Sequence, residues 1–245
     1  MAGELRAWFP QTTAPFICNA PMFGFANSEL AASVTKAGGF GIWKTVAQAK
    51  KVTNDSYLGF IGGGLDFTET STHIAQLRSE LSNARKLLGI PPEDILPIGV
   101  GFIMFRPENF LRGIIPVLQE HRPAAVWLFA AKDGDRYAQF IPALKAESKS
   151  WGLKVFVQIG SVNGAREALE DGADILVVQG TDAGGHQFAL GAGLMTLLPE
   201  VVDMVKTEFP DSKTVVAAAG GIMDGRGIAA AQVLGRPIRP AVLLG

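Results

Sequence analysis

Several features that would narrow a function at once are scarce in this sequence. Its 245 residues include one cysteine, Cys18, so an internal disulfide framework is excluded and a reducing compartment is favoured. The 22 lysines and arginines nearly balance the 23 aspartates and glutamates, which leaves a formal net charge of −1. That balance offers no electrostatic attraction for nucleic acid or for an anionic membrane surface. We therefore expect neither of them as a partner.

Long apolar runs and a targeting sequence are also missing. The longest apolar runs have the length of a strand, and residues 1–15 do not join a basic start to an apolar segment. We therefore expect an intracellular protein, in the cytoplasm. Metal binding is not expected, because no second histidine or cysteine stands at a ligand spacing from His186. The glycine signature of a Rossmann fold and the serine elbow of hydrolases are absent as well.

The sequence does contain a regular alternation of strand-like and helical segments. Its hydrophobic content of 48% is enough for a large core, and we expect a single domain over residues 1–245. Strands are predicted at 16–19, 40–43, 96–102, 125–129, 154–158, 175–179 and 214–219, with 241–245 as an eighth. Helices are predicted at 28–36, 70–88, 137–148 and 163–170, and from just after Asp224 through Ala231. The alternation predicts an α/β fold, a TIM (β/α)8-type barrel.

The first of these helices carries its own start and stop signals. Ser28 is a suitable N-cap, and Gly38 with Gly39 would end the helix. Leu30, Val34 and Ala37 recur at helical spacing, which supports a helix here.

The region that follows is harder to interpret. Residues 57–61 have no clear assignment, and 62–64 are three glycines that we interpret as a flexible loop over the barrel mouth. His73 starts a predicted surface helix, and His121 lies in a polar turn. We expect both histidines to be solvated and without a catalytic role.

The most informative segment is a strand that runs into a glycine-rich turn. Residues 175–179 are apolar up to Gln179, and Gly184, Gly185 and His186 follow closely. Barrel enzymes place their chemistry at the carboxyl ends of the strands, where an imidazole can exchange a proton near neutral pH. His186 is therefore the candidate catalytic residue, although position alone leaves a structural role open.

Other polar groups are expected at the same end of the barrel. Gln158 and Gln179 end predicted strands, so their amides either bind a cofactor or cap the sheet. Gly220 and Gly221 follow another strand and precede a helix, an arrangement that holds phosphate in many barrels. The alternative for this pair is a tight strand–helix turn without a ligand.

Motifs at the ends of these strands also occur in the order of a known family. They are NAPM at 19–22, GVGF at 99–102, QGTDAGGH at 179–186 and AAGGIMDGR at 218–226. Together they resemble the nitronate monooxygenases, formerly called 2-nitropropane dioxygenases. The resemblance implies an FMN-dependent barrel that oxidises alkyl nitronates and nitroalkanes with molecular oxygen. It also implies that His186 is the base that deprotonates nitroalkanes.

The resemblance further implies which residues contact the flavin and its phosphate. They are Ala20, Pro21, Met22, Gln158, Gln179, Gly184, Gly185, Gly220 and Gly221. Flavin-dependent enoyl reductases are relatives that share these turns, so such a reductase is one alternative.

The second alternative comes from the end of the sequence. Family members continue past the eighth strand through a Gly-Thr pair and a segment that closes the barrel, whereas this sequence stops at Gly245. Residues 236–240 also differ from the expected turn. We therefore expect a barrel truncated just after the eighth strand, without the closing segment, and a catalytically impaired flavin-binding fragment stays open as an interpretation.

Overall fold

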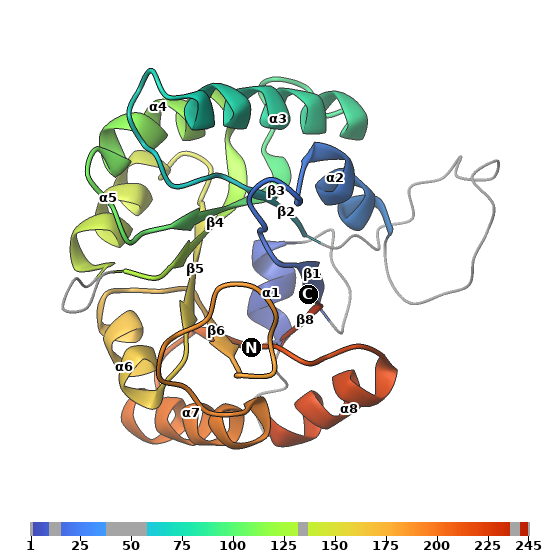
Figure 1. The fold of residues 1–245 in the computed structure, drawn as a ribbon, viewed down its shortest axis with the longest axis vertical. Coiled ribbons are helices and arrows are strands. Elements are labelled where there is room, and N and C mark those ends of the chain that lie inside the picture. Colours follow the sequence, from blue (N-terminus) through green and yellow to red (C-terminus); the bar gives the residue numbers. More distant parts are fainter. Residues whose placement is uncertain (1, 10–15, 38–57, 132–136, 236–240, 245) are drawn as a thin grey trace.

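The computed structural model describes residues 2–9, 16–37, 58–131, 137–235 and 241–244. Eight parallel strands form one sheet in the order β1-β8-β7-β6-β5-β4-β3-β2 (Figure 1). A parallel bridge between Cys18 and Leu58 joins the two ends of that order and closes the barrel. The prediction of an α/β fold of the TIM-barrel type is therefore confirmed.

The strands and helices alternate along the chain. The strands are β1 (Ile17–Asn19), β2 (Gly59–Gly62), β3 (Leu96–Ile103), β4 (Pro123–Phe129), β5 (Lys154–Ile159), β6 (Ile175–Gln179), β7 (Val215–Ala219) and β8 (Ala241–Leu244). The helices are α1 (Ala2–Trp8), α2 (Ser28–Ala37), α3 (Thr72–Leu88), α4 (Phe110–His121), α5 (Phe140–Glu147), α6 (Val162–Glu170), α7 (Leu194–Glu208) and α8 (Gly225–Leu234), with a 3₁₀ turn, Tyr137–Gln139, before α5. None of the helices in the described part of the chain is long and apolar enough to span a membrane.

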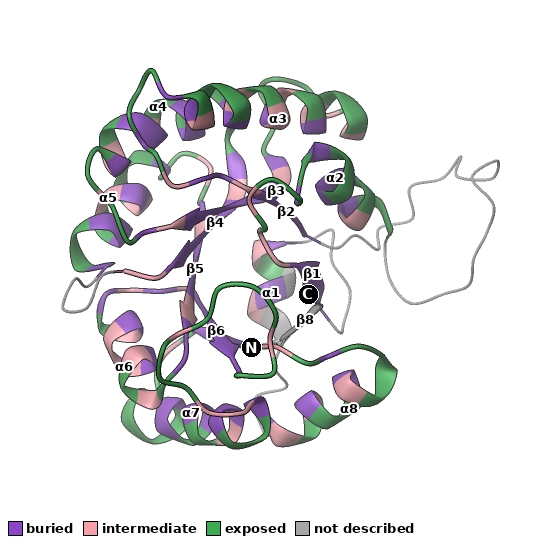
Figure 2. Cartoon of the chain, viewed as in Figure 1, coloured by how far each residue is buried: buried purple, intermediate pink, exposed green. Residues whose placement is uncertain are grey.

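Two hydrophobic cores follow from the side-chain alternation of the strands. Leu176 and Val178 of β6 face the surrounding helices, whereas Ile175 and Val177 face the barrel interior. Figure 2 shows the strands buried and the outer faces of the helices exposed. In Figure 1, α1 lies at the far end of the barrel, and its Leu5 belongs to the interior core. The other end of the barrel is thus the one open to a ligand.

Most predicted elements are found close to their predicted bounds, and one unassigned segment is a strand. The segment 57–61 overlaps β2, so Gly62 ends a strand and is not part of a flexible loop. A Cβ at Gly62 would lie 2.5 Å from the backbone nitrogen of Phe23, so this strand needs glycine for a close approach. The predicted strand 40–43 and the helix stop at 38–39 lie outside the described residues, as do 236–240 and Gly245.

The predicted helix is found as α2, but its apolar residues at helical spacing do not form its buried face. Leu30 and Ala37 are exposed, and the helix instead buries Ala31, Ala32, Thr35 and Ser28. The reason is the short distance to β2, because a Cβ added at Gly59 would lie 1.9 Å from the carbonyl oxygen of Ala31. Only small side chains fit there. The helix cap also lies one residue earlier than predicted, since Asn27 Oδ1 accepts a hydrogen bond from the Leu30 amide.

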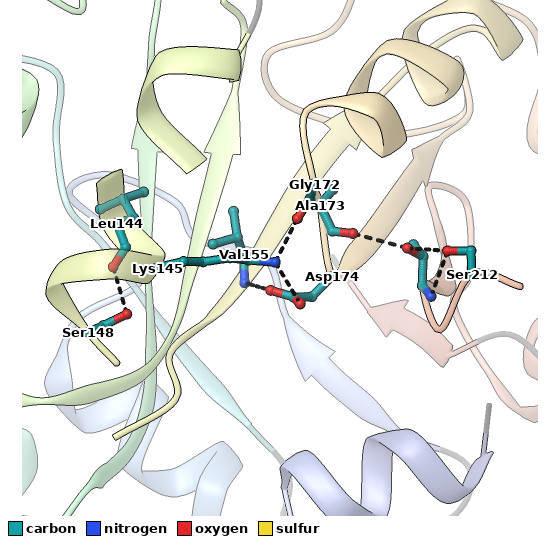
Figure 3. A network of polar contacts seen from close by, with 9 residues as sticks. Leu144, Lys145, Ser148, Val155, Gly172, Ala173, Asp174 and Ser212 are labelled. Carbon is teal, nitrogen blue, oxygen red and sulfur yellow. Dashed lines mark hydrogen bonds and ion pairs between the residues drawn. The ribbon is translucent and has the colours of Figure 1, made fainter. Parts of the chain in front are cut away.

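A polar network ties the strands together at the amino-terminal end of the barrel (Figure 3). Asp174 accepts a hydrogen bond from the Val155 amide at 2.8 Å and pairs with Lys145 Nζ at 3.0 Å. Lys145 Nζ also donates to the Gly172 carbonyl, and Thr214 Oγ1 donates to the Ala173 carbonyl. These contacts join α5, β5, β6 and β7 far from the mouth, where residues serve stability and not chemistry.

Candidate active site

A cavity of about 390 Å³ opens at the carboxyl ends of the strands. Its size falls in the range of roughly 300–1,000 Å³ that is common for small-molecule and cofactor sites. The predicted site residues that line it are Ala20, Pro21, Met22, Gln158, Gln179, Gly184, Gly185 and His186. Residues far apart in the sequence therefore meet here, as expected for strand ends of one barrel.

Gly220 and Gly221 do not line this cavity but adjoin it. Both have positive φ angles, of 103° and 68°, which glycine adopts without strain. A Cβ at Gly220 would lie 3.0 Å from Ala183, and one at Gly221 would lie 2.9 Å from Asp182 Cβ. The turn after β7 thus supports the loop that carries His186, and a small residue is required at each position.

The start of α8 is capped by the protein itself. Asp224 accepts hydrogen bonds from the Arg226 and Gly227 amides, at 2.8 and 3.4 Å. The Arg226 side chain also donates to this carboxylate and, ahead of the two amides, lowers its pKa. The Asp224 carboxylate already occupies those amides and the positive end of the helix dipole. A phosphate near this turn would therefore have to bind the backbone N–H groups of the glycine turn.

The floor of the cavity depends on glycine in β3. A Cβ at Gly101 would lie 2.2 Å from the ring of Pro21, so only glycine lets this proline lie across the strand. Asn19, one residue after Cys18, bonds through its side chain to both the amide and the carbonyl of Phe60 at 2.9 Å. This side chain adds to the single bridge between Cys18 and Leu58 at the seam of β1 and β2, next to the segment that begins at Ala20.

The two glutamines have amides whose orientation is fixed by their partners. Trp127 Nε1 donates to Gln158 Oε1 at 2.9 Å, and an indole can only donate, so the Gln158 amide nitrogen keeps its two hydrogens for another partner. Gln179 Nε2 donates to the His186 carbonyl at 3.0 Å. A carbonyl can only accept, so Gln179 keeps an acceptor, Oε1, which is buried and has no hydrogen-bond partner among the described residues.

The loop after β6 is anchored on both sides of His186. Asp182 accepts a hydrogen bond from the Leu194 amide at the start of α7. Phe188 packs edge-on against Phe129, with 5.2 Å between ring centroids, and lies over Gly160. The loop is therefore held between the ends of β4, β5 and β7, and His186 projects from its middle.

His186 itself is exposed, and within the described part of the chain no residue hydrogen-bonds to its imidazole. Its backbone is fixed by Gln179 while its ring stays available at the cavity edge. That combination suits a group that must meet a ligand proton. No set of three or more histidine, cysteine, aspartate or glutamate side chains suited to a metal ion is found among the residues that the structure describes.

Of the other two histidines, His121 is buried, contrary to the sequence-based expectation, and His73 is partly buried. His121 is only 5% exposed, and burial, followed by the charges of Arg85 and Arg78, lowers its pKa to about 4. His73 is half-buried and accepts hydrogen bonds from two loop amides. The sequence does not indicate either environment, because both histidines have polar sequence neighbours and their burial comes from tertiary packing.

Sequence reasoning also missed residues that shape the site. Trp127, Phe129 and Phe102 line the cavity, and Gly160 makes room for Phe188. Alternation along β4 could have indicated that Trp127 shares the interior face with Gln158 on the neighbouring strand. The contact between Phe188 and Gly160 has no local signal in the sequence.

Comparisons with known proteins agree with this geometry. Residues 128–237 match the sequence model of the nitronate monooxygenase family. The chain is 42% identical over 245 residues to a nitronate monooxygenase of Neurospora crassa. The aligned region covers 95% of this chain and 60% of that protein. These two matches support the nitronate monooxygenase family for this chain. A second relative, nitronate monooxygenase npaC of Metarhizium robertsii, is 34% identical. The aligned region covers 92% of this chain and 57% of that protein.

Solved structures support the fold as well. FabK from Thermotoga maritima superposes with a TM-score of 0.68 at 25% identity, over 99% of this chain and 60% of its own. A nitroalkane oxidase from Streptomyces ansochromogenes superposes with a TM-score of 0.68 at 23% identity, over 100% of this chain and 67% of its own, which shows the fold alone. The chain thus spans about 60% of the length of the curated relatives it matches.

Proposed function

We propose that this chain forms the flavin-binding barrel of an enzyme that oxidises alkyl nitronates and nitroalkanes with molecular oxygen. The observation that carries the proposal is the cavity at the barrel mouth, which collects His186, the glycine turn before it and two amides of fixed orientation. The relatives at 42% and 34% identity are named nitronate monooxygenases, which supports the same chemistry. The reductase and the impaired-fragment alternatives gain no support from these names.

The chemistry of the cavity fits FMN. A flavin ring carries alternating carbonyl acceptors and an N–H donor along one edge, and the cavity provides the Gln158 amide nitrogen as donor and the orphaned Gln179 Oε1 as acceptor. Trp127 and Phe129 of β4 also line the cavity and add apolar surface there. Gln158 and Gln179 would hold the ring edge, and bound FMN would supply the electron transfer to oxygen.

Backbone segments would hold the rest of the cofactor. Ala20, Pro21 and Met22 line one side of the cavity, and Gly184 with Gly185 lines another, where the absence of a side chain permits a close approach. The turn at 220–221 would bind the phosphate through backbone N–H groups, because it contacts Ala183, the residue before the cavity-lining Gly184.

His186 would act on the substrate. Its ring is exposed at the cavity edge and can accept the proton from the carbon next to the nitro group, because imidazole is a base near neutral pH. A nitronate has already lost that proton, so it needs the imidazole only for binding.

The test compares His186→Asn with the wild type on FMN-loaded protein, with oxygen uptake as the measurement and no nicotinamide added. For nitroethane, turnover should fall about 10²–10⁴-fold, the usual contribution of a general base. For pre-formed ethyl nitronate, the loss should be clearly smaller. Ala189→Ser, in the same loop but outside the cavity lining, should leave both rates unchanged.

Two results would contradict this reading. Equal losses on both substrates would show that His186 positions the ligand and does not accept the proton. A wild-type protein with the visible absorbance of bound FMN but no oxygen uptake with any nitro compound would refute the proposed activity.

A further inference from the structure

The loop between β2 and α3 forms one wall of the cavity. Gly64 and Leu65 of this loop line it, next to Phe23 from the loop after β1. The Gly63 amide is bonded to the Gly101 carbonyl at 2.7 Å, but the next amides leave the sheet. Their backbone N–H groups need other partners if the wall is to keep its shape.

His73 supplies that partner. Its Nδ1 accepts hydrogen bonds from the Asp66 amide at 3.1 Å and from the Leu65 amide at 3.4 Å. A nitrogen that accepts must be unprotonated, so these two donors place the proton of the neutral ring on Nε2. One imidazole nitrogen therefore fixes the direction of two consecutive peptides.

The same ring contacts the second loop of this wall. The Phe23 ring lies 4.7 Å from the His73 ring between centroids, at an interplanar angle of 54°. Gly64 has a φ of +89°, and a Cβ there would lie 3.1 Å from His73. The imidazole is thus packed between the loops after β1 and β2, and it holds both.

Helix capping does not explain this arrangement. Ser71 already caps α3, because its side chain accepts a hydrogen bond from the Ile74 amide and donates to the Asp66 carbonyl. The N-cap position of the helix is filled without the His73 side chain. Its contacts therefore serve the loops and not the helix.

We propose that His73 is a positioning residue for the ligand of this cavity. It holds Leu65 and Phe23 in the wall through the acceptor at Nδ1 and through ring packing. This inference rests on the proposed function in one respect, that the cavity binds flavin and a nitro substrate. Because His73 touches the wall and does not line the cavity, it affects ligand affinity and leaves the chemical step unchanged.

Three substitutions separate the acceptor from the ring. His73→Asn places Oδ1 at the same number of bonds from the backbone as Nδ1 and keeps the acceptor. His73→Gln moves its amide one bond further, to the reach of Nε2, and His73→Phe keeps the ring but has no acceptor. Gln76→Ala, exposed on the same helix, is the matched control.

The first measurement needs no cofactor or activity. Hydrogen exchange of the Leu65 and Asp66 amides should rise at least about fivefold in the Phe and Gln variants, while α3 amides stay unchanged. The Asn variant and the control should match the wild type. Loss of protection in the whole of α3 would show that His73 serves the helix, and this would overturn the proposal.

The second measurement is FMN affinity by fluorescence titration, with steady-state kinetics on nitroethane. In the Phe and Gln variants the Kd for FMN and the KM should rise about three- to tenfold, the scale of a lost hydrogen bond, with kcat within about twofold. The Asn variant keeps the acceptor but lacks the ring that packs on Phe23, so its Kd and KM should lie between those of the wild type and those of the Phe variant. A fall in kcat at constant KM, or an Asn variant as weak as Phe, overturns the positioning role. If wild-type protein binds no FMN, the proposed function fails, whereas the exchange measurement still decides the role of His73.

Discussion

Gly160 offers a direct test of how the His186 loop is held. This glycine follows β5 at the mouth, and a Cβ there would lie 2.4 Å from Cδ2 of Phe188 and 2.8 Å from its Cγ. Gly160 has no positive φ, so alanine fits its backbone without strain. Gly160→Ala therefore acts through one contact, the displacement of the Phe188 ring.

The size of the effect follows from what that ring would lose. Phe188 is half-buried and packs edge-on against Phe129, and such aromatic pairs contribute about 0.5–1.5 kcal/mol beyond burial. Overpacking of a filled site costs about 1–3 kcal/mol. We expect Gly160→Ala to lower the free energy of unfolding by about 1–3 kcal/mol, which corresponds to a fall in Tm of about 2–12 °C in a chain of this size.

A double-mutant cycle with Phe188→Ala tests the cause. Thermal unfolding of the two single variants and the double variant should show that alanine at 160 has little further cost once the ring is gone, a coupling of about 1–3 kcal/mol. Gly164→Ala, in α6, is the matched control: its Cβ would lie 3.3 Å from Ser161 Oγ, a milder approach than at Gly160, and the free energy of unfolding should change by no more than about 1 kcal/mol. Costs at 160 and 188 that add within about 0.5 kcal/mol would refute the packing argument.

Two further predictions concern stability. Asp174→Ala leaves the Val155 amide without its acceptor and should lower the free energy of unfolding in urea by about 1–3 kcal/mol, whereas Asp174→Asn keeps an acceptor oxygen and should lose less; equal losses would contradict this. The pKa of His121, lowered by burial and by two arginines to about 4, is below the ordinary value of about 6.5, so the unfolded chain binds a proton between these values that the folded chain does not. Stability should therefore fall as pH drops from about 6.5 to 4, by up to about 3 kcal/mol, because the half-exposed Glu120, 3.4 Å away, compensates a buried charge poorly. His121→Gln should remove this part of the pH dependence of the urea midpoint, and an unchanged dependence would show that His121 is not its source.

The strands that the sequence predicts well are those with continuous apolar runs. Residues 175–178 and 155–157 are such runs, and both lie in strands, β6 and β5. β2 has no such run, because Gly59 and Gly62 replace side chains where α2 and the loop at Phe23 approach the backbone closely. A strand whose side chains are removed for packing reasons cannot be recognised from hydrophobicity alone.

Helices α1, α4 and α7 were not predicted. Pro116 lies inside α4 and Pro199 inside α7, and a proline within an apolar pattern normally indicates the end of a helix. Pro116 is exposed and Pro199 half-buried, so the lost backbone hydrogen bond of each does not lie deep in the core. Burial of the apolar faces of these helices outweighs the cost of the proline, which only the tertiary structure can show.

The candidate site also has features that the sequence predicts and features that it does not. His186 and the two glutamines were predicted because each stands at or just beyond the end of a strand, and parallel strands bring their ends together. The orientation of the glutamine amides was not predictable. It depends on Trp127 from another strand and on the path of the loop back to the barrel.

Gln179 links the position of His186 to the state of the cavity. Its amide nitrogen holds the His186 carbonyl, and its Oε1 accepts no hydrogen bond from the described residues. A ligand that donates a hydrogen bond to Oε1 polarises the amide and strengthens its N–H bond to that carbonyl, because hydrogen bonds in series reinforce one another in a medium of low dielectric constant. Linkage makes this coupling reciprocal, so a loop held in place by Phe188 and Asp182 also raises the affinity for the ligand. A pocket that binds cofactor through Gln179 therefore also fixes the backbone from which the His186 imidazole projects.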